Sequence, residues 1–150
     1  MEYPKYRVRS SIKTFRDLHI YKQTNNISAS IITIDVPEGY KRNKHINEEL
    51  SELQDTSKNI PRLIAESFGD RFSNPKMALK KLEKSTQLIS NNISRIDLLN
   101  AVINEQEFKE KLLAILKRYQ YVRPKILNLK NAWDHVDQKR KDQSKEVIPA

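Results

Sequence analysis

Cysteine is absent from this chain of 150 residues, and glycine occurs only twice and proline only six times. The absence of cysteine excludes disulfides, thiol catalysis and zinc sites with cysteine ligands. So few glycines and prolines argue against an all-β fold, which needs frequent tight turns. No apolar run approaches the roughly 20 residues of a membrane-spanning helix, and the first residues lack the apolar segment of a signal peptide. We therefore expect a cytoplasmic protein without a membrane segment.

The formal charge of the chain is +9, and two segments carry most of the excess. The first is residues 1–16, which include Arg7 and Arg9. The second, residues 111–130, has no acidic residue and these basic ones: Lys111, Lys117, Arg118, Arg123, Lys125 and Lys130. Positive charge concentrated in this way favours an anionic partner such as nucleic acid. Nothing in the sequence indicates a cofactor.

Apolar residues that recur at spacings of three and four predict four helices, at residues 14–35, 46–68, 74–102 and 105–134. Four amphipathic helices with short connections pack most simply as an all-α, antiparallel, up-down-up-down four-helix bundle.

The expected domain plan is a basic N-terminal arm at residues 1–13, the four-helix bundle at residues 14–135, and a disordered polar tail at residues 136–150.

Capping residues and helix breakers set the expected helix ends. Thr14 with Asp17 forms a capping box before the first helix, and Asn104 with Glu107 does the same before the fourth. Pro61 falls inside the second helix, where its missing N–H predicts a kink.

Two short motifs carry a resemblance to a known family. Residues 15–22, FRDLHIYK, resemble the F-x-D-L-x-V-[YW]-x opening of bacterial four-helix-bundle proteins encoded in intervening sequences of large-subunit ribosomal RNA genes. Residues 57–67, SKNIPRLIAES, resemble that family's S-I-P-x-N-I-A-E-G signature, but with Leu63 where Asn is usual and Ser67 where Gly is usual. Residues 126–133 are similar to the I-G-R-M-L-G-G-W ending of the related accessory variability determinant proteins of diversity-generating retroelements.

The resemblance implies an antiparallel four-helix bundle that assembles into a ring-like homopentamer. For the retroelement branch it implies a basic surface that binds nucleic acid and a reverse transcriptase. For the ribosomal-insert branch it implies a role in ribosomal RNA metabolism that is poorly defined. It carries over no catalytic residue.

The residues themselves leave three functions open. In the first, a non-enzymatic protein binds RNA or DNA phosphates through two basic rows that flank the apolar stripe of the fourth helix. The alternative to this first function is that acids of the second helix, Glu48, Glu49, Glu52 and Asp55, pair with the basic rows inside the chain. In the second function, an oligomeric scaffold binds an acidic protein partner. In the third, Arg42 and His45 serve a ribonuclease-like toxin, although the pair is expected at a loop–helix boundary.

Overall fold

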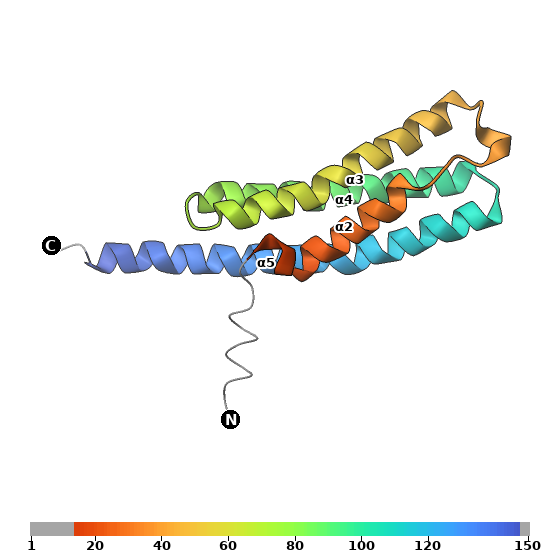
Figure 1. Ribbon diagram of the computed structural model, residues 1–150. Helices are drawn as coiled ribbons and strands as arrows, with labels where there is room; N and C mark the ends of the chain where they lie inside the picture. Colours follow the sequence, from red (N-terminus) through yellow and green to blue (C-terminus); the bar gives the residue numbers. More distant parts are fainter. Residues whose placement is uncertain (1–13, 148–150) are drawn as a thin grey trace.

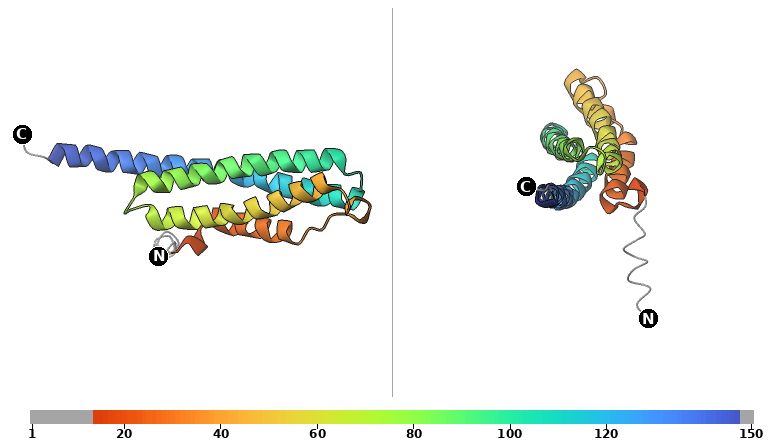
Figure 2. Two further views of the ribbon diagram at one scale, coloured as in Figure 1. Left: turned by 90° about the horizontal axis from the view of Figure 1, so that it is seen from above. Right: turned by 90° about the vertical axis from the view of Figure 1, so that its left-hand side faces the viewer.

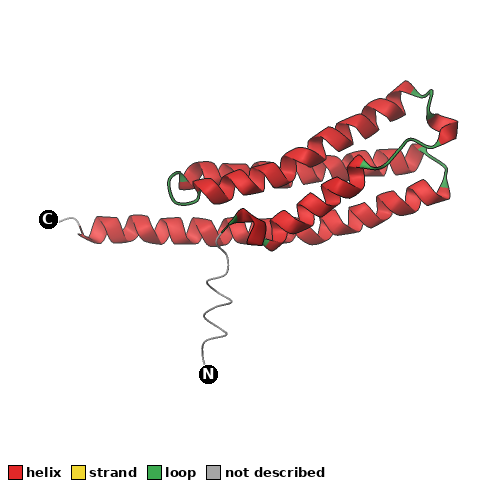
Figure 3. Ribbon diagram, viewed as in Figure 1, coloured by secondary structure: helices red, strands yellow, loops and turns green. Residues whose placement is uncertain are grey.

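All four segments with helical apolar periodicity are helical in the computed structural model (Figure 1). The structure describes the backbone of residues 14–147 and the side chains as far as residue 143. The helices are α2 (His19–Ile32), α3 (Lys44–Asp70), α4 (Pro75–Val102) and α5 (Gln106–Val147). Two short 3-10 turns, η1 (Phe15–Asp17) and η2 (Glu38–Tyr40), precede α2 and α3. The described residues contain no strand, and Figure 3 shows only helices and the loops that join them.

The helices form a closed ring in which each packs against two neighbours. α2 contacts α3, α3 contacts α4, α4 contacts α5, and α5 returns to contact α2. Consecutive helices run in opposite directions (Figure 1), and the end-on view of Figure 2 shows α3 and α5 at opposite corners. The fold is therefore the predicted all-α four-helix bundle with up-down-up-down order.

The predicted apolar stripes form the core of the bundle. Their central residues are essentially inaccessible to solvent: Ile27, Leu53, Ile64, Leu82, Ile89, Ile96, Leu112, Tyr119, Val122 and Ile126. Burial of one such side chain contributes about 1.5–3 kcal/mol, so this interior supplies the main driving force for folding. Pro124 is exposed, as its position off the stripe of α5 predicts.

Pro61 lies inside α3, which continues through it and changes direction part-way along its length (Figure 1). Proline has no N–H, so the carbonyl of Ser57, four residues earlier, lacks its helical donor. The hydroxyl of Ser28 on α2 donates to that carbonyl at 2.7 Å. Both serines are buried, and this hydrogen bond therefore joins α2 to α3 where the helix ladder is interrupted.

A chain of polar contacts that is buried at Asn92 and Tyr119 and reaches the surface at Glu52 links α5, α4 and α3. Asn92 on α4 donates from Nδ2 to the hydroxyl of Tyr119 on α5 at 3.2 Å, and its Oδ1 accepts from Arg95 at 3.1 Å. Arg95 in turn lies 3.3 Å from Glu52 and 3.9 Å from Glu49 of α3. Burial raises the pKa of Tyr119 to about 12, an effect that its hydrogen bond with Asn92 partly opposes.

The first helix is shorter than predicted. The capping box of Thr14 and Asp17 is present, but it caps η1, and the chain then becomes extended at Leu18 before α2 begins. Leu18 is buried, so the break places an apolar side chain in the core. At the other end α2 stops at Ile32, where the side-chain amide of Gln54 on α3 donates to the carbonyl of Ile34 at 3.0 Å.

The fourth helix differs from the prediction at both ends. Its first turn is capped by Glu105, whose carboxylate accepts from the N–H groups of Glu107 and Phe108 at 3.2 and 2.9 Å, and not by Asn104. The backbone N–H of Asn104 instead donates to the hydroxyl of Tyr40 at 2.7 Å.

Residues 136–147 of the predicted disordered tail are helical, because α5 continues to Val147, and residues 148–150 lie outside the described residues. Lys141 lies 3.3 Å from Asp137 one turn earlier, and Arg140 lies over the ring of Phe72 at the end of the bundle. These contacts stabilise helical turns that the polar, aperiodic sequence alone does not predict.

Candidate nucleic-acid interface

The basic residues of α5 lie on two flanks of the helix, as their seven-residue spacing predicts. Arg118 faces α2, where its Nη1 donates a hydrogen bond to the hydroxyl of Ser30 at 3.1 Å. Arg123 faces α4, where its Nε donates to the carbonyl oxygen of Thr86 at 3.4 Å. Both arginines are half-buried, so each is held against a neighbouring helix.

The remaining basic residues of α5 differ in whether a carboxylate lies near them. Lys111 is 3.6 Å from Glu107 on the same helix, and Lys130 is 4.0 Å from Glu83 on α4. The other four have no carboxylate partner among the described residues: Lys117, Arg118, Arg123 and Lys125. Lys117 is exposed, and the ammonium group of Lys125 lies 4.7 Å from the centre of the Tyr121 ring. Positive charge on α5 is therefore only partly neutralised within the chain.

The acidic residues of α3 do not neutralise α5. Glu49 and Glu52 pair with Arg95 of α4, whereas Glu48 and Asp55 pair with lysines of α3 itself. The geometric reason is that α3 and α5 occupy opposite corners of the ring (Figure 2). The alternative in which acids of the second helix cancel the basic rows is therefore wrong.

The neighbouring helix α2 adds no negative charge to this face. Between Asp17 and Asp35 the chain has no acidic residue. A concave region of about 300 Å³ lies where α2 meets α5, lined by Ser30, Lys111 and Arg118 among others. Because no carboxylate lies on α2, the positive potential of the α5 flank extends across this concavity.

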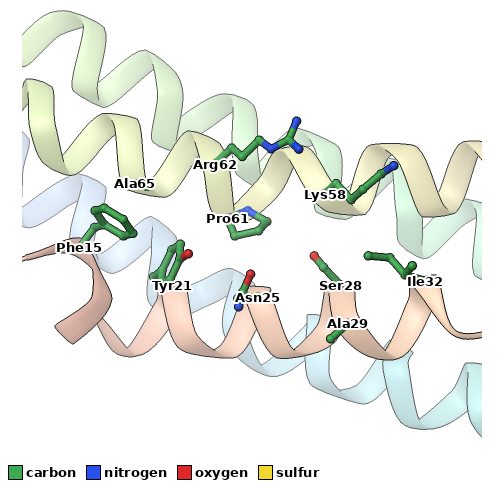
Figure 4. A pocket seen from close by; sticks show the side chains of 10 residues that line it. All are labelled: Phe15, Tyr21, Asn25, Ser28, Ala29, Ile32, Lys58, Pro61, Arg62 and Ala65. Carbon is green, nitrogen blue, oxygen red and sulfur yellow. The ribbon is translucent and has the colours of Figure 1, made fainter.

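A second groove, of about 500 Å³, lies on the other side of α2, against α3 (Figure 4). Tyr21 and Asn25 point from α2 toward α3, and Lys58 and Arg62 stand on the α3 wall. Lys58 is 3.3 Å from Asp55, whereas Arg62 has no carboxylate partner among the described residues. Sequence reasoning missed these two cations, although their spacing of four residues could have placed them on one face of a helix.

Arg7 and Arg9, the predicted binding residues of the N-terminal arm, lie outside the described residues.

The candidate catalytic pair of the ribonuclease hypothesis lies on the surface. Arg42 is in the turn after η2 and His45 in the first turn of α3, at the expected loop–helix boundary, and both side chains are exposed. Among the side chains that the structure describes, no three from His, Asp or Glu gather where they could hold a metal ion. None of the described helices combines the length and apolar character of a membrane span.

Comparison of the chain with family models, with curated proteins and with solved structures found no match to any of them.

Proposed function

We propose that this chain binds nucleic acid, without catalysing a reaction, through the face where α5 and α2 meet, hereafter the α2–α5 face. The observation that carries the proposal is that Lys117, Arg118 and Lys125 of α5 have no carboxylate partner among the described residues, and that the neighbouring helix α2 has no acidic residue. Phosphate contacts from such cations release condensed counterions and give an affinity that does not depend on base sequence.

The way in which side chains are held on the α2–α5 face supports nucleic-acid binding more strongly than the net charge of the chain does. Lysines on a solvated surface are common, but here Arg118 is held on the α2 side of α5 by its hydrogen bond to the Ser30 hydroxyl. Fixed guanidinium groups lose less side-chain entropy when they bind phosphate.

The test is fluorescence anisotropy with a labelled oligonucleotide of about 16 nucleotides, between about 0.05 and 0.2 M salt. The variant is Lys117→Gln, Arg118→Gln and Lys125→Gln, in which the new side-chain amide at position 118 can still donate a hydrogen bond to Ser30. The matched control is Lys76→Gln, Lys80→Gln and Lys84→Gln, which removes the same charge from α4.

We expect the α5 variant to bind more weakly and to lose about 0.7–0.9 of the log–log salt slope for each phosphate contact removed. The α4 control should bind almost as wild type, because its lysines lie away from the α2–α5 face. Equal losses in the two variants, or no binding by wild type near 0.1 M salt, contradict the proposal. The acidic-protein scaffold then becomes the better hypothesis, because it uses the same charge.

The family resemblance extends the proposal. We propose a cytoplasmic homo-oligomer, with five copies as the expected number, that acts beside a reverse transcriptase or in ribosomal RNA metabolism. The support is the two motifs at residues 15–22 and 57–67, which occur in the order and spacing of that family.

A further inference from the structure

The end of the bundle formed by the α3–α4 turn exposes an aromatic cleft. Phe72, in that turn, is 66% exposed, the largest exposed fraction among the large apolar side chains of the described residues. Trp133 and Val136 of α5 and Pro75 of α4 line the same cleft, which has a volume of about 210 Å³. α2 does not extend as far as this turn, and α5 continues past it (Figure 1), so α5 is covered by fewer helices here than in the middle of the bundle.

Two arginines flank the exposed ring. The guanidinium carbon of Arg71 lies 4.3 Å from the centre of the Phe72 ring, and that of Arg140 lies 5.6 Å from it. Arg71 also lies over Phe68, at 3.5 Å. The one acid in the cleft lining, Asp137, is paired with Lys141 at 3.3 Å. The cleft therefore offers flat π surfaces together with net positive charge.

From this arrangement we propose that the cleft binds an unpaired nucleobase and its phosphate, so that the preferred ligand is single-stranded nucleic acid. Aromatic rings stack on bases of any identity, and guanidinium groups beside them contact the phosphate. A base inside a duplex is already stacked on both sides and must be extruded at a cost of a few kcal/mol before it can enter such a site. Two of the seven lining residues, Phe72 and Trp133, are aromatic, and two more, Arg71 and Arg140, carry guanidinium groups, which suits a base with its phosphate.

This inference rests on the proposed function, and the geometry of α5 connects the two. Lys125 and Trp133 are eight residues apart, which is about 12 Å along a helix axis. A stacked strand rises about 3.4 Å per nucleotide along its axis, so three or four nucleotides of such a strand span the two positions. One strand can therefore contact the basic flank of α5 and place a terminal base in the cleft.

Trp133 is the only tryptophan of the chain and lies in the cleft, so its fluorescence reports on the site directly. The full-length protein is titrated with oligothymidylate, with oligouridylate and with a blunt DNA duplex, each about 16 nucleotides long, within the range of known site sizes. Anisotropy of the labelled strand and Trp133 emission are recorded together. The thymidylate and uridylate arms distinguish DNA from RNA as the source of the base.

We expect single strands to quench Trp133 and the duplex to leave it unchanged. Phe72→Ala should abolish the quenching and weaken single-strand binding by roughly 5- to 140-fold, with duplex affinity unchanged. Phe72→Tyr should keep both the Trp133 quenching and the single-strand affinity, because tyrosine retains the aromatic ring. Leu98→Ala is the matched control, since Leu98 is also exposed but lies on α4. Arg140→Gln is a second variant, expected to reduce the salt slope for single strands by about 0.7.

The outcomes separate the two proposals. If wild type binds no oligonucleotide at about 0.1 M salt, the proposed function fails and this inference fails with it. If wild type binds but Trp133 emission stays constant, or Phe72→Ala and Arg140→Gln bind single strands as wild type does, the cleft assignment is overturned while the α2–α5 face stands. If Trp133 emission changes with protein concentration alone, a second copy fills the cleft, and the assignment is again overturned.

Discussion

Replacing Ser28 by alanine should destabilise the bundle by more than the loss of a single buried hydroxyl normally does. The hydroxyl donates to the Ser57 carbonyl at 2.7 Å, and Pro61 supplies no N–H to that carbonyl. Ser57 is buried, so in the folded chain its carbonyl depends on the Ser28 hydroxyl for a donor. A buried acceptor left without a donor costs about 1–3 kcal/mol, which is the expected loss in free energy of unfolding for Ser28→Ala.

A double-mutant cycle with Pro61→Ala isolates the cause. Alanine at position 61 restores the backbone N–H that the Ser57 carbonyl lacks, so the Ser28 hydroxyl is no longer its only donor. Ser28→Ala should then cost only about 0–1 kcal/mol in the Pro61→Ala background, an interaction energy of about 1–2 kcal/mol between the two positions. The assay is urea unfolding followed by circular dichroism, at one protein concentration for all four chains.

Ser85→Ala is the matched control for this cycle. Ser85 is also fully buried in a helix, and its hydroxyl donates to the Leu82 carbonyl at 2.6 Å. That carbonyl keeps its helical donor in the variant, so only the net contribution of one hydrogen bond is lost, about 0.5–1 kcal/mol. The reasoning is refuted if Ser28→Ala and Ser85→Ala cost the same, or if the Ser28 and Pro61 changes add within about 0.3–0.5 kcal/mol.

Three further predictions concern stability and assembly. Burial raises the pKa of Tyr119 to about 12, so the neutral side chain contributes its full stability below a pH of about 10, and this contribution is lost as the pH rises toward 12. Tyr119→Phe should not show this loss of stability at alkaline pH, which urea unfolding across that pH range measures. Gln54→Ala removes the amide that bonds the carbonyl of Ile34, and should cost about 1 kcal/mol and speed amide hydrogen exchange at the end of α2 more than in α4. Light scattering at micromolar concentration should report a multiple of the 17.7 kDa chain, five copies being expected, and a monomer at that concentration contradicts the homo-oligomer.

The helical order and core were predictable because they depend on local periodicity. A stripe at spacings of three and four specifies which side of a helix is buried, and the stripe of α5 from Leu112 to Ile126 is buried throughout. The helix ends were less predictable, because side chains from other helices determine them. Leu18 leaves the helix to enter the core, and Gln54 closes the end of α2 from a neighbouring helix. Neither contact is visible in the sequence around residues 14–35.

The candidate interface was also predictable in part from local periodicity. The seven-residue spacing of Lys111, Arg118 and Lys125 is enough to place them in one register of a helix. Which neighbours they meet depends on the order of the helices around the ring, and the folded bundle brings Arg118 against Ser30 on α2. The cleft at Phe72 depends on a turn between two helices and on a third helix that continues past it, so no local pattern indicates it.

The polar composition of α2 weakens the apolar pattern that predicts this helix, and it also adds no negative charge to the α2–α5 face. α2 carries a polar run, Gln23 to Asn26, where a strong apolar stripe is expected, and it is the shortest of the four helices. Neutral hydrogen bonds hold it against α3: the Ser28 hydroxyl of α2 donates to the Ser57 carbonyl, and the Gln54 amide of α3 donates to the Ile34 carbonyl just past α2. Neutral partners add no carboxylate, so they anchor α2 without cancelling the charge of Arg118 beside it. Acidic residues at these positions could pair with that cation, but they would oppose an incoming phosphate.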